Sequence, residues 1–152
     1  MTMEITYLTQ LSTFNERPFP NEGLSMEQIQ DLRAKFNNGK PFPKAFEEYL
    51  YLAGTYNNIA FDGPDTLEEL QHELAQVMED FHKKIDRPWF AFHEQELHYL
   101  IIFLDETNDD PTCYICSPND DKVFGDKFIS EAGYTFVTIV NETIRRLKNG
   151  TF

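Results

Sequence analysis

Residues 93–98, His-Glu-Gln-Glu-Leu-His, combine the residue types that a zinc hydrolase uses. The helix of a zinc protease has its two histidines four residues apart, because that spacing lets both imidazoles reach one metal ion. Here the spacing is five, and strand residues five apart face opposite sides of a sheet unless a turn folds them together. The spacing therefore argues against a hydrolase that uses His93, Glu94 and His98.

Cys113 and Cys116 have the spacing of a redox pair or of half a zinc site. A redox pair needs a helix start to lower the thiol pKa, and a structural zinc needs four ligands. Both cysteines instead fall within a predicted strand, where they point to opposite faces of the sheet. We expect two small buried residues, and two cysteines do not make the disulfide framework of a small secreted protein.

Residues 105–110 resemble the start of a calcium-binding loop, but Asp110 and Cys116 stand where that loop needs a glycine and a bidentate glutamate. The glycines are isolated and form no phosphate-binding motif. Nor does any motif place a base beside a Ser, Cys or Lys nucleophile. The sequence therefore predicts no catalytic residue, no metal site and no cofactor.

The formal net charge of −13 is concentrated in the middle of the chain. Residues 45–121 hold eighteen Asp and Glu against three Lys and Arg, and residues 88–121 hold no Lys or Arg at all. An acidic field repels nucleic acid and anionic membranes and attracts a basic protein, although ordinary solubilising surface is the alternative explanation.

The candidate partner-binding residues are the acids in the loops of the predicted sheet and two strand tyrosines that could equally be core. They are Glu94, Glu96, Tyr99, Asp105, Glu106, Asp109, Asp110, Tyr114, Asp120 and Asp121.

Three helices are predicted in the first part of the chain. A capping box at Ser25 and Gln28 begins the first, Pro41-Phe42-Pro43 precedes the second, and Asp65 or Thr66 begins the third. The third helix has the clearest apolar face, and that face continues to Ile85.

Strands are predicted after Pro88, where aromatic and β-branched residues dominate. Residues 89–92 and 97–104 form a hairpin that turns near residues 94–96, and residues 112–116 and 122–124 follow as further strands. A last helix covers residues 135–147. The expected fold is a single α+β domain over residues 1–152, in which N-terminal helices precede an antiparallel sheet of about four strands and a closing C-terminal helix.

The start of the chain lacks the basic and apolar regions of a signal peptide, and no apolar run is long enough to span a membrane. We therefore expect a cytoplasmic protein.

Residues 24–148 resemble a known superfamily in the order of their core positions. An Ile-x-x-Leu helix leads to Phe42-Pro43, Phe46 and Tyr49-Leu50. Ala53-Gly54 then stands near the position at which the superfamily has a glycine doublet. Residues 89–92, Trp-Phe-Ala-Phe, then precede a long apolar strand that ends in Asp105, and the strand at residues 111–115 follows. Phe136 and Val140 stand in the closing helix. This order is similar to that of the SUKH superfamily, which includes the yeast Smi/Knr regulator and many bacterial immunity proteins.

The resemblance implies that the chain is a bacterial immunity protein that binds and neutralises a basic toxin, often a nuclease. A nuclease is basic because it holds phosphate, so an acidic inhibitor can mimic its substrate. The alternative that the resemblance implies is an intracellular regulatory or scaffold module that binds a cellular protein. Neither role involves nucleic acid, membrane or catalysis, and the oligomeric state is not predicted.

Overall fold

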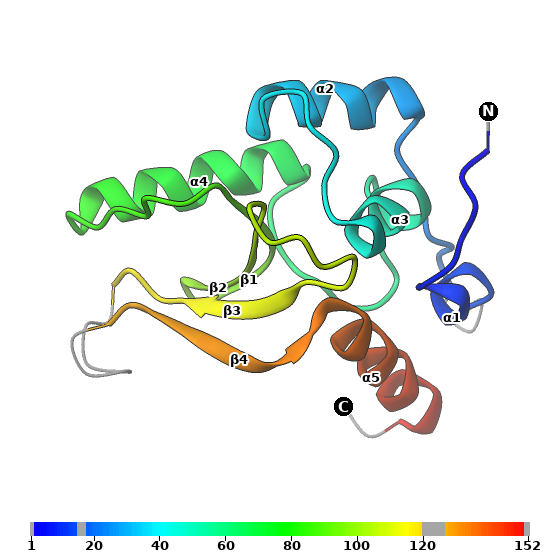
Figure 1. Cartoon of the computed structure of the whole chain (residues 1–152). Coiled ribbons are helices and arrows are strands. Elements are labelled where there is room, and N and C mark those ends of the chain that lie inside the picture. Colours follow the sequence, from blue (N-terminus) through cyan, green and yellow to red (C-terminus); the bar gives the residue numbers. More distant parts are fainter. Residues whose placement is uncertain (1, 15–17, 120–126, 151–152) are drawn as a thin grey trace. The chain divides into compact units, whose positions relative to one another are not determined.

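The computed structural model describes residues 2–14, 18–119 and 127–150 (Figure 1). Its elements, in chain order, are α1 (Thr9–Ser12), α2 (Met26–Phe36), α3 (Lys44–Ala53), α4 (Leu67–Asp80), β1 (Trp89–Gln95), β2 (His98–Phe103), β3 (Thr112–Cys116), β4 (Ile129–Thr135) and α5 (Phe136–Asn149). The expected α+β order of helices, four-stranded antiparallel sheet and closing helix is confirmed. No helix in the described part of the chain is long and apolar enough to cross a membrane.

The chain divides into two compact units. Unit 1 contains residues 1–60, 107–111 and 135–152, and unit 2 contains residues 61–106 and 112–134. Unit 1 therefore holds α1, α2, α3 and α5, and unit 2 holds α4 and the sheet.

Unit 1 is built around an aromatic cluster that joins α3 to α5. The ring of Phe136, the first residue of α5, lies 5.0 Å from that of Phe46 and 5.5 Å from that of Tyr49, both edge-on. All three side chains are buried, and edge-to-face pairs add to the free energy gained by burying such large rings. The apolar spacing that predicted α3 and α5 therefore marks their shared core.

Two helices of unit 1 begin with a side-chain cap, and the cap of α2 is the one predicted. Ser25 Oγ accepts a hydrogen bond from the Gln28 N–H, and Gln28 Oε1 accepts one from the Ser25 N–H, which completes the expected capping box of α2. Thr135 caps α5 in a similar way by accepting from the Thr138 N–H. Each cap satisfies backbone donors that the first helical turn leaves without partners.

Two adjacent glutamates of α3 are buried in unit 1. Glu47 pairs with Arg33 and also accepts from the Phe42 N–H. The Glu48 carboxylate accepts from the backbone N–H groups of three successive residues, Thr6, Tyr7 and Leu8, at 2.9–3.1 Å. Such bonds offset the cost of burying a charge. Glu48 thus fastens the N-terminal segment to α3.

Unit 2 is a sheet of order β1-β2-β3-β4 with α4 against one of its faces (Figure 1). The core between them contains Leu70, Leu74 and Met78 of α4 and faces Tyr99 and Ile101 of β2. β1 and β2 form an antiparallel hairpin with a bulge between Ala91 and His93.

The outer edge of β1 is bonded to a side chain of α4. Gln71 donates from Nε2 to the Ala91 carbonyl at 2.8 Å and accepts through Oε1 from the Ala91 N–H at 2.7 Å. An amide side chain offers one donor and one acceptor, as a neighbouring strand would. Gln71 therefore satisfies a pair of edge groups inside the protein.

α4 is shorter than its apolar face suggests. It ends in a Schellman motif, in which His82 takes a positive φ of 57° and the Lys83 N–H donates to the Met78 carbonyl. Ile85 still packs against the core after the helix has ended. The apolar periodicity thus marked burial correctly but overestimated the helix.

Two strands differ from their predicted positions. β1 runs on to Gln95, so the hairpin turns later than expected. The strand expected at residues 122–124 lies outside the described residues, and the fourth strand is β4, at Ile129–Thr135. The sequence did not indicate this strand, because it contains Gly133, and glycine is unfavourable within strands. Gly133 takes a left-handed φ of 90° there.

Candidate functional site

The tip of the β1–β2 hairpin has an unusual backbone. Glu96 and Leu97 occupy the two turn positions with φ of 53° and 63°. Positive φ at both positions is the geometry of a type I′ turn, which normally selects Asn and Gly. In a residue with a Cβ this conformation costs about 1 kcal/mol, and the bond from the Leu97 N–H to Glu94 Oε1 at 3.2 Å helps to hold it. Strain of this kind is often retained at binding sites.

This turn places His93 and His98 on the same face of the sheet. His93 pairs with Leu100 and Gln95 pairs with His98, and residues that are paired or two apart on a strand share a face. The turn thus folds the histidines together, which is the exception that their spacing left open. Glu94 pairs with Tyr99 on the opposite face, so His93, Glu94 and His98 do not form one hydrolase site.

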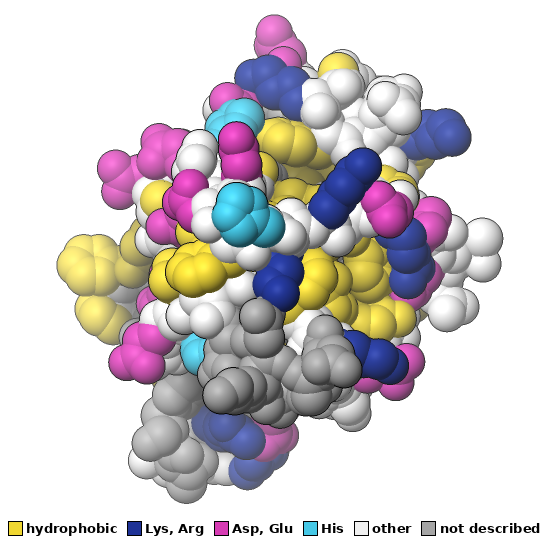
Figure 2. Space-filling model, turned by 90° about the vertical axis from the view of Figure 1, so that its left-hand side faces the viewer, with side chains coloured by type: hydrophobic (Ala, Val, Ile, Leu, Met, Phe, Trp, Pro, Cys, Tyr) yellow, Lys and Arg dark blue, Asp and Glu magenta, His cyan; other side chains and the backbone are white. Residues whose placement is uncertain are grey.

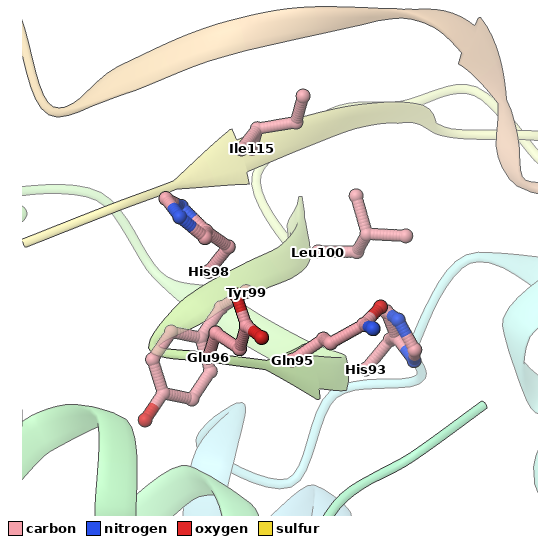
Figure 3. Close-up of a pocket in the computed structure, with 7 residues that line it drawn as sticks. All are labelled: His93, Gln95, Glu96, His98, Tyr99, Leu100 and Ile115. Carbon is pink, nitrogen blue, oxygen red and sulfur yellow. The ribbon is translucent and has the colours of Figure 1, made fainter. Parts of the chain in front are cut away.

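An open pocket of about 400 Å³ lies on the histidine face of the hairpin (Figure 3). Its lining includes His93, Gln95, Glu96, His98, Leu100 and Ile115. Figure 3 shows Leu100 and Ile115 projecting to the same side from β2 and β3, with the two imidazoles at separate ends of the group. The pocket thus has an apolar floor and a polar border.

The His93 ring is held in one tautomer. Its Nδ1 accepts a hydrogen bond from the Asp62 N–H at 2.8 Å, and Phe61 packs beside it with ring centroids 5.8 Å apart. Burial lowers the pKa of His93, although the charges of Asp62 and Glu94 oppose the shift. A neutral ring that accepts at Nδ1 carries its proton on Nε2. Nε2 is therefore a hydrogen-bond donor.

His98 is fixed by a different contact. Its Nδ1 lies 2.6 Å from Ser117 Oγ, which is buried after β3. Both histidines thus use Nδ1 within the protein. No group of three or more His, Cys, Asp or Glu among the described residues is arranged to hold a metal ion.

The opposite face of the hairpin contains a buried polar group. Tyr99 is fully buried, and its hydroxyl interacts with the carboxyl group of Glu73. Burial and the nearby charge of Glu94 raise the pKa of Glu73, while Tyr99 opposes the rise. Burial also raises the pKa of Tyr99. Tyr99 therefore offers no exposed aromatic ring to a partner.

Asp105, Glu106 and Tyr114 are held by one cation, Arg87. Arg87 Nη2 lies 2.7 Å from Asp105 Oδ1 and 3.6 Å from Glu106 Oε2, and its guanidinium lies 3.8 Å from the Phe103 ring centroid. Tyr114 donates to Glu106 at 3.1 Å. The hydrogen bond from Arg87 lowers the pKa of Asp105. These three candidates already have partners within unit 2.

Asp109 and Asp110 belong to unit 1. Asp109 accepts from the Tyr7 hydroxyl at 2.8 Å, and Asp110 Oδ1 accepts from the Val137 N–H in the first turn of α5. Both therefore help to hold unit 1 together. Asp120 and Asp121 lie outside the described residues.

The two cysteines are buried, as expected. Cys116 belongs to the core beneath α4, and burial raises its pKa to about 12. A thiol with so high a pKa stays protonated at neutral pH and is a poor nucleophile. The structure thus gives Cys116 no redox chemistry.

The most acidic described element was not among the sequence candidates. α4 carries Glu68, Glu69, Glu73, Glu79 and Asp80 and no Lys or Arg. Glu69, Glu79 and Asp80 are exposed. Figure 2 shows one side of the molecule, on which acidic side chains lie beside hydrophobic ones, with Lys and Arg side chains among them. The sequence could have indicated this acidic helix, because its predicted residues include several acids and no Lys or Arg.

The chain matches no protein-family model and no curated protein.

Proposed function

We propose that this chain is a non-catalytic immunity protein that binds and neutralises a basic toxin, of nuclease type, through the acidic side chains of unit 2. The binding surface consists of the exposed acids of α4, named above, together with Glu94 and Glu96 of the hairpin. The resemblance to the SUKH superfamily supplies the biological role, and the charge distribution supplies the chemistry.

The observation that carries the proposal is the absence of Lys and Arg from α4. Between residues 61 and 119 the only cations are Lys83, Lys84 and Arg87, all of which follow α4. Lys84 pairs with Asp86 and Arg87 pairs with Asp105, so two of these charges are directed to acids outside α4. A helix with exposed acids and no Lys or Arg of its own attracts basic proteins and speeds their association.

The arrangement of the hairpin supports a binding role over catalysis. The candidate acid Glu94 and the two histidines lie on opposite faces of the sheet. The Cys116 thiol has a pKa of about 12. The separation of Glu94 from the histidines and the high pKa of Cys116 both favour binding by charge and shape over catalysis.

The test is binding of the protein encoded next to this gene, measured over a salt series. We expect a complex whose association rate falls steeply as salt rises, since screening weakens attraction between exposed charges. Glu69→Gln combined with Glu79→Gln should slow association severalfold. Glu27→Gln, which removes an acid from the first turn of α2 in unit 1, is the matched control and should leave the rate nearly unchanged.

An association rate that is indifferent to salt would contradict electrostatic capture. A complex with a cellular protein but none with the neighbouring gene product would instead favour the regulatory or scaffold role of the Smi/Knr type.

A further inference from the structure

The floor of the hairpin pocket is apolar but remains partly open to solvent. Leu100 of β2 and Ile115 of β3 are paired across the two strands and both are half-buried. Neighbouring positions on the other face of the same strands, such as Ile101 and Cys116, are fully buried. Apolar side chains that form the bottom of a pocket gain free energy when a ligand covers them.

The border of the pocket limits what can cover this floor. Glu96 is exposed at the turn and is one of the residues that line the pocket, so its negative charge repels anions such as phosphate or a carboxylate. His93 presents a neutral imidazole, because its Nδ1 accepts from the Asp62 N–H. A neutral imidazole does not repel a cation.

These features together fit one side chain better than others. Arginine has an apolar stem that can lie on Leu100 and Ile115 and a planar guanidinium that stacks on aromatic rings and pairs with carboxylates. Lysine has a compact, strongly hydrated ammonium that gains less from a ring face. A purely apolar side chain would leave Glu96 without a partner.

We propose that the hairpin pocket formed by Leu100, Ile115, His93 and Glu96 binds an arginine side chain of the basic partner. The stem lies on the two aliphatic residues, and the guanidinium pairs with Glu96 at the turn end of the pocket. This inference rests on the proposed function, because it takes a basic protein as the partner. The acids of α4 then supply general attraction, and the pocket supplies selectivity.

Octa-arginine and octalysine peptides of equal charge separate the two contributions. We expect both peptides to bind the wild-type protein at low salt, with octa-arginine tighter by about three- to tenfold. Glu96→Gln and Leu100→Ala should each reduce that ratio. Glu69→Gln is the control of matched charge on α4 and should weaken both peptides equally. Glu96 is an exposed turn residue, so its variant keeps the test valid if Leu100→Ala fails to fold.

The location is tested directly by titrating N-acetyl-arginine amide and following backbone amide resonances by NMR. We expect the resonances of Leu100, Ile115 and Glu96 to shift in the wild-type protein and to shift less in Glu96→Gln. Shifts confined to α4, or an arginine preference that both pocket variants retain, would overturn the pocket. If neither peptide binds while N-acetyl-arginine amide still shifts these resonances, the proposed function fails and the pocket stands.

Discussion

In unit 1 two adjacent glutamates of α3 are buried and bonded, whereas in unit 2 Glu69 and Glu79 of α4 and Glu96 of the hairpin are exposed. The Glu48 carboxylate accepts hydrogen bonds from three backbone N–H groups. Burial raises the pKa of Glu73, and Glu69 is exposed. Glutamate therefore stabilises the fold in unit 1 and contributes surface charge in unit 2.

This difference shows that a count of acids does not measure an acidic surface. Glu47, Glu48, Asp109 and Asp110 all add to the negative charge of the middle of the chain, yet each bonds to groups within unit 1. The charge that can attract a partner is therefore smaller than the sequence suggests and is concentrated in unit 2. Variants of both kinds of carboxylate can test this distinction.

The largest effect is expected from Glu48→Ala. Three backbone N–H groups would lose a charged acceptor, so the free energy of unfolding should fall by about 3–5 kcal/mol. Urea unfolding measures this loss. Glu69→Ala on α4 is the comparison and should cost about 0.5 kcal/mol, the value of an acid in a first helical turn. Equal losses from the two variants would remove the distinction between the units.

Arg87→Gln should come next in size. It removes the cation that holds Asp105 and Glu106, so the pKa of Asp105 should rise towards its ordinary value of 3.8. The stability should fall by about 1 kcal/mol, since the pair is exposed but bidentate. Octalysine should bind more tightly because two carboxylates become available. An NMR titration of the Asp105 carboxyl and a binding curve measure these changes, and unchanged octalysine binding would count against the charge model.

The effect of Glu73→Gln on the free energy of unfolding should depend on pH. Burial raises the pKa of Glu73 above 4.5, so the folded state holds its proton more tightly than the unfolded state. The associated stability is present below pH 4.5 and is lost as the pH rises through the folded pKa. The free energy of unfolding of the variant, relative to that of the wild type, should therefore rise from acid to neutral pH. Urea unfolding at pH 3.5 and pH 7 gives the two values, and a constant difference would refute the linkage.

The smallest effect is expected from Glu142→Gln in α5. Hydrogen bonds from Arg145 and Arg146 lower the pKa of Glu142 to about 2. Its charge is already matched within unit 1, so its removal should leave octalysine binding unchanged. The same titration that tests Glu69→Gln measures this, and an equal loss of binding would place attractive charge in both units.

The sequence predicted elements whose signals are local. Ser25 and Gln28 are adjacent enough to form their box without the rest of the fold, and the aromatic run at residues 89–92 lies within β1. Signals that depend on distant partners were missed. Nothing near Glu48 in the sequence indicates that residues 6–8 would bind its carboxylate.

The candidate site was predicted only in part for the same reason. Glu94 and Glu96 fall in the hairpin that carries the pocket, but the pocket depends on strand register. A two-residue turn at Glu96 and Leu97 puts His98 on the His93 face, and a three-residue turn, which shifts the register by one residue, would have put the two histidines on opposite faces. Leu100 and Ile115 had no distinguishing pattern, because half-buried and buried strand residues have the same composition.

The bond between Gln71 and Ala91 also bears on aggregation. The strand that it covers contains Trp89, Phe90 and Phe92, a short aromatic segment of the kind that adds readily to other strands. Whenever α4 detaches, as in partial unfolding or during synthesis, the backbone groups of Ala91 become available to another chain. One glutamine side chain therefore links the docking of a helix to protection against self-association.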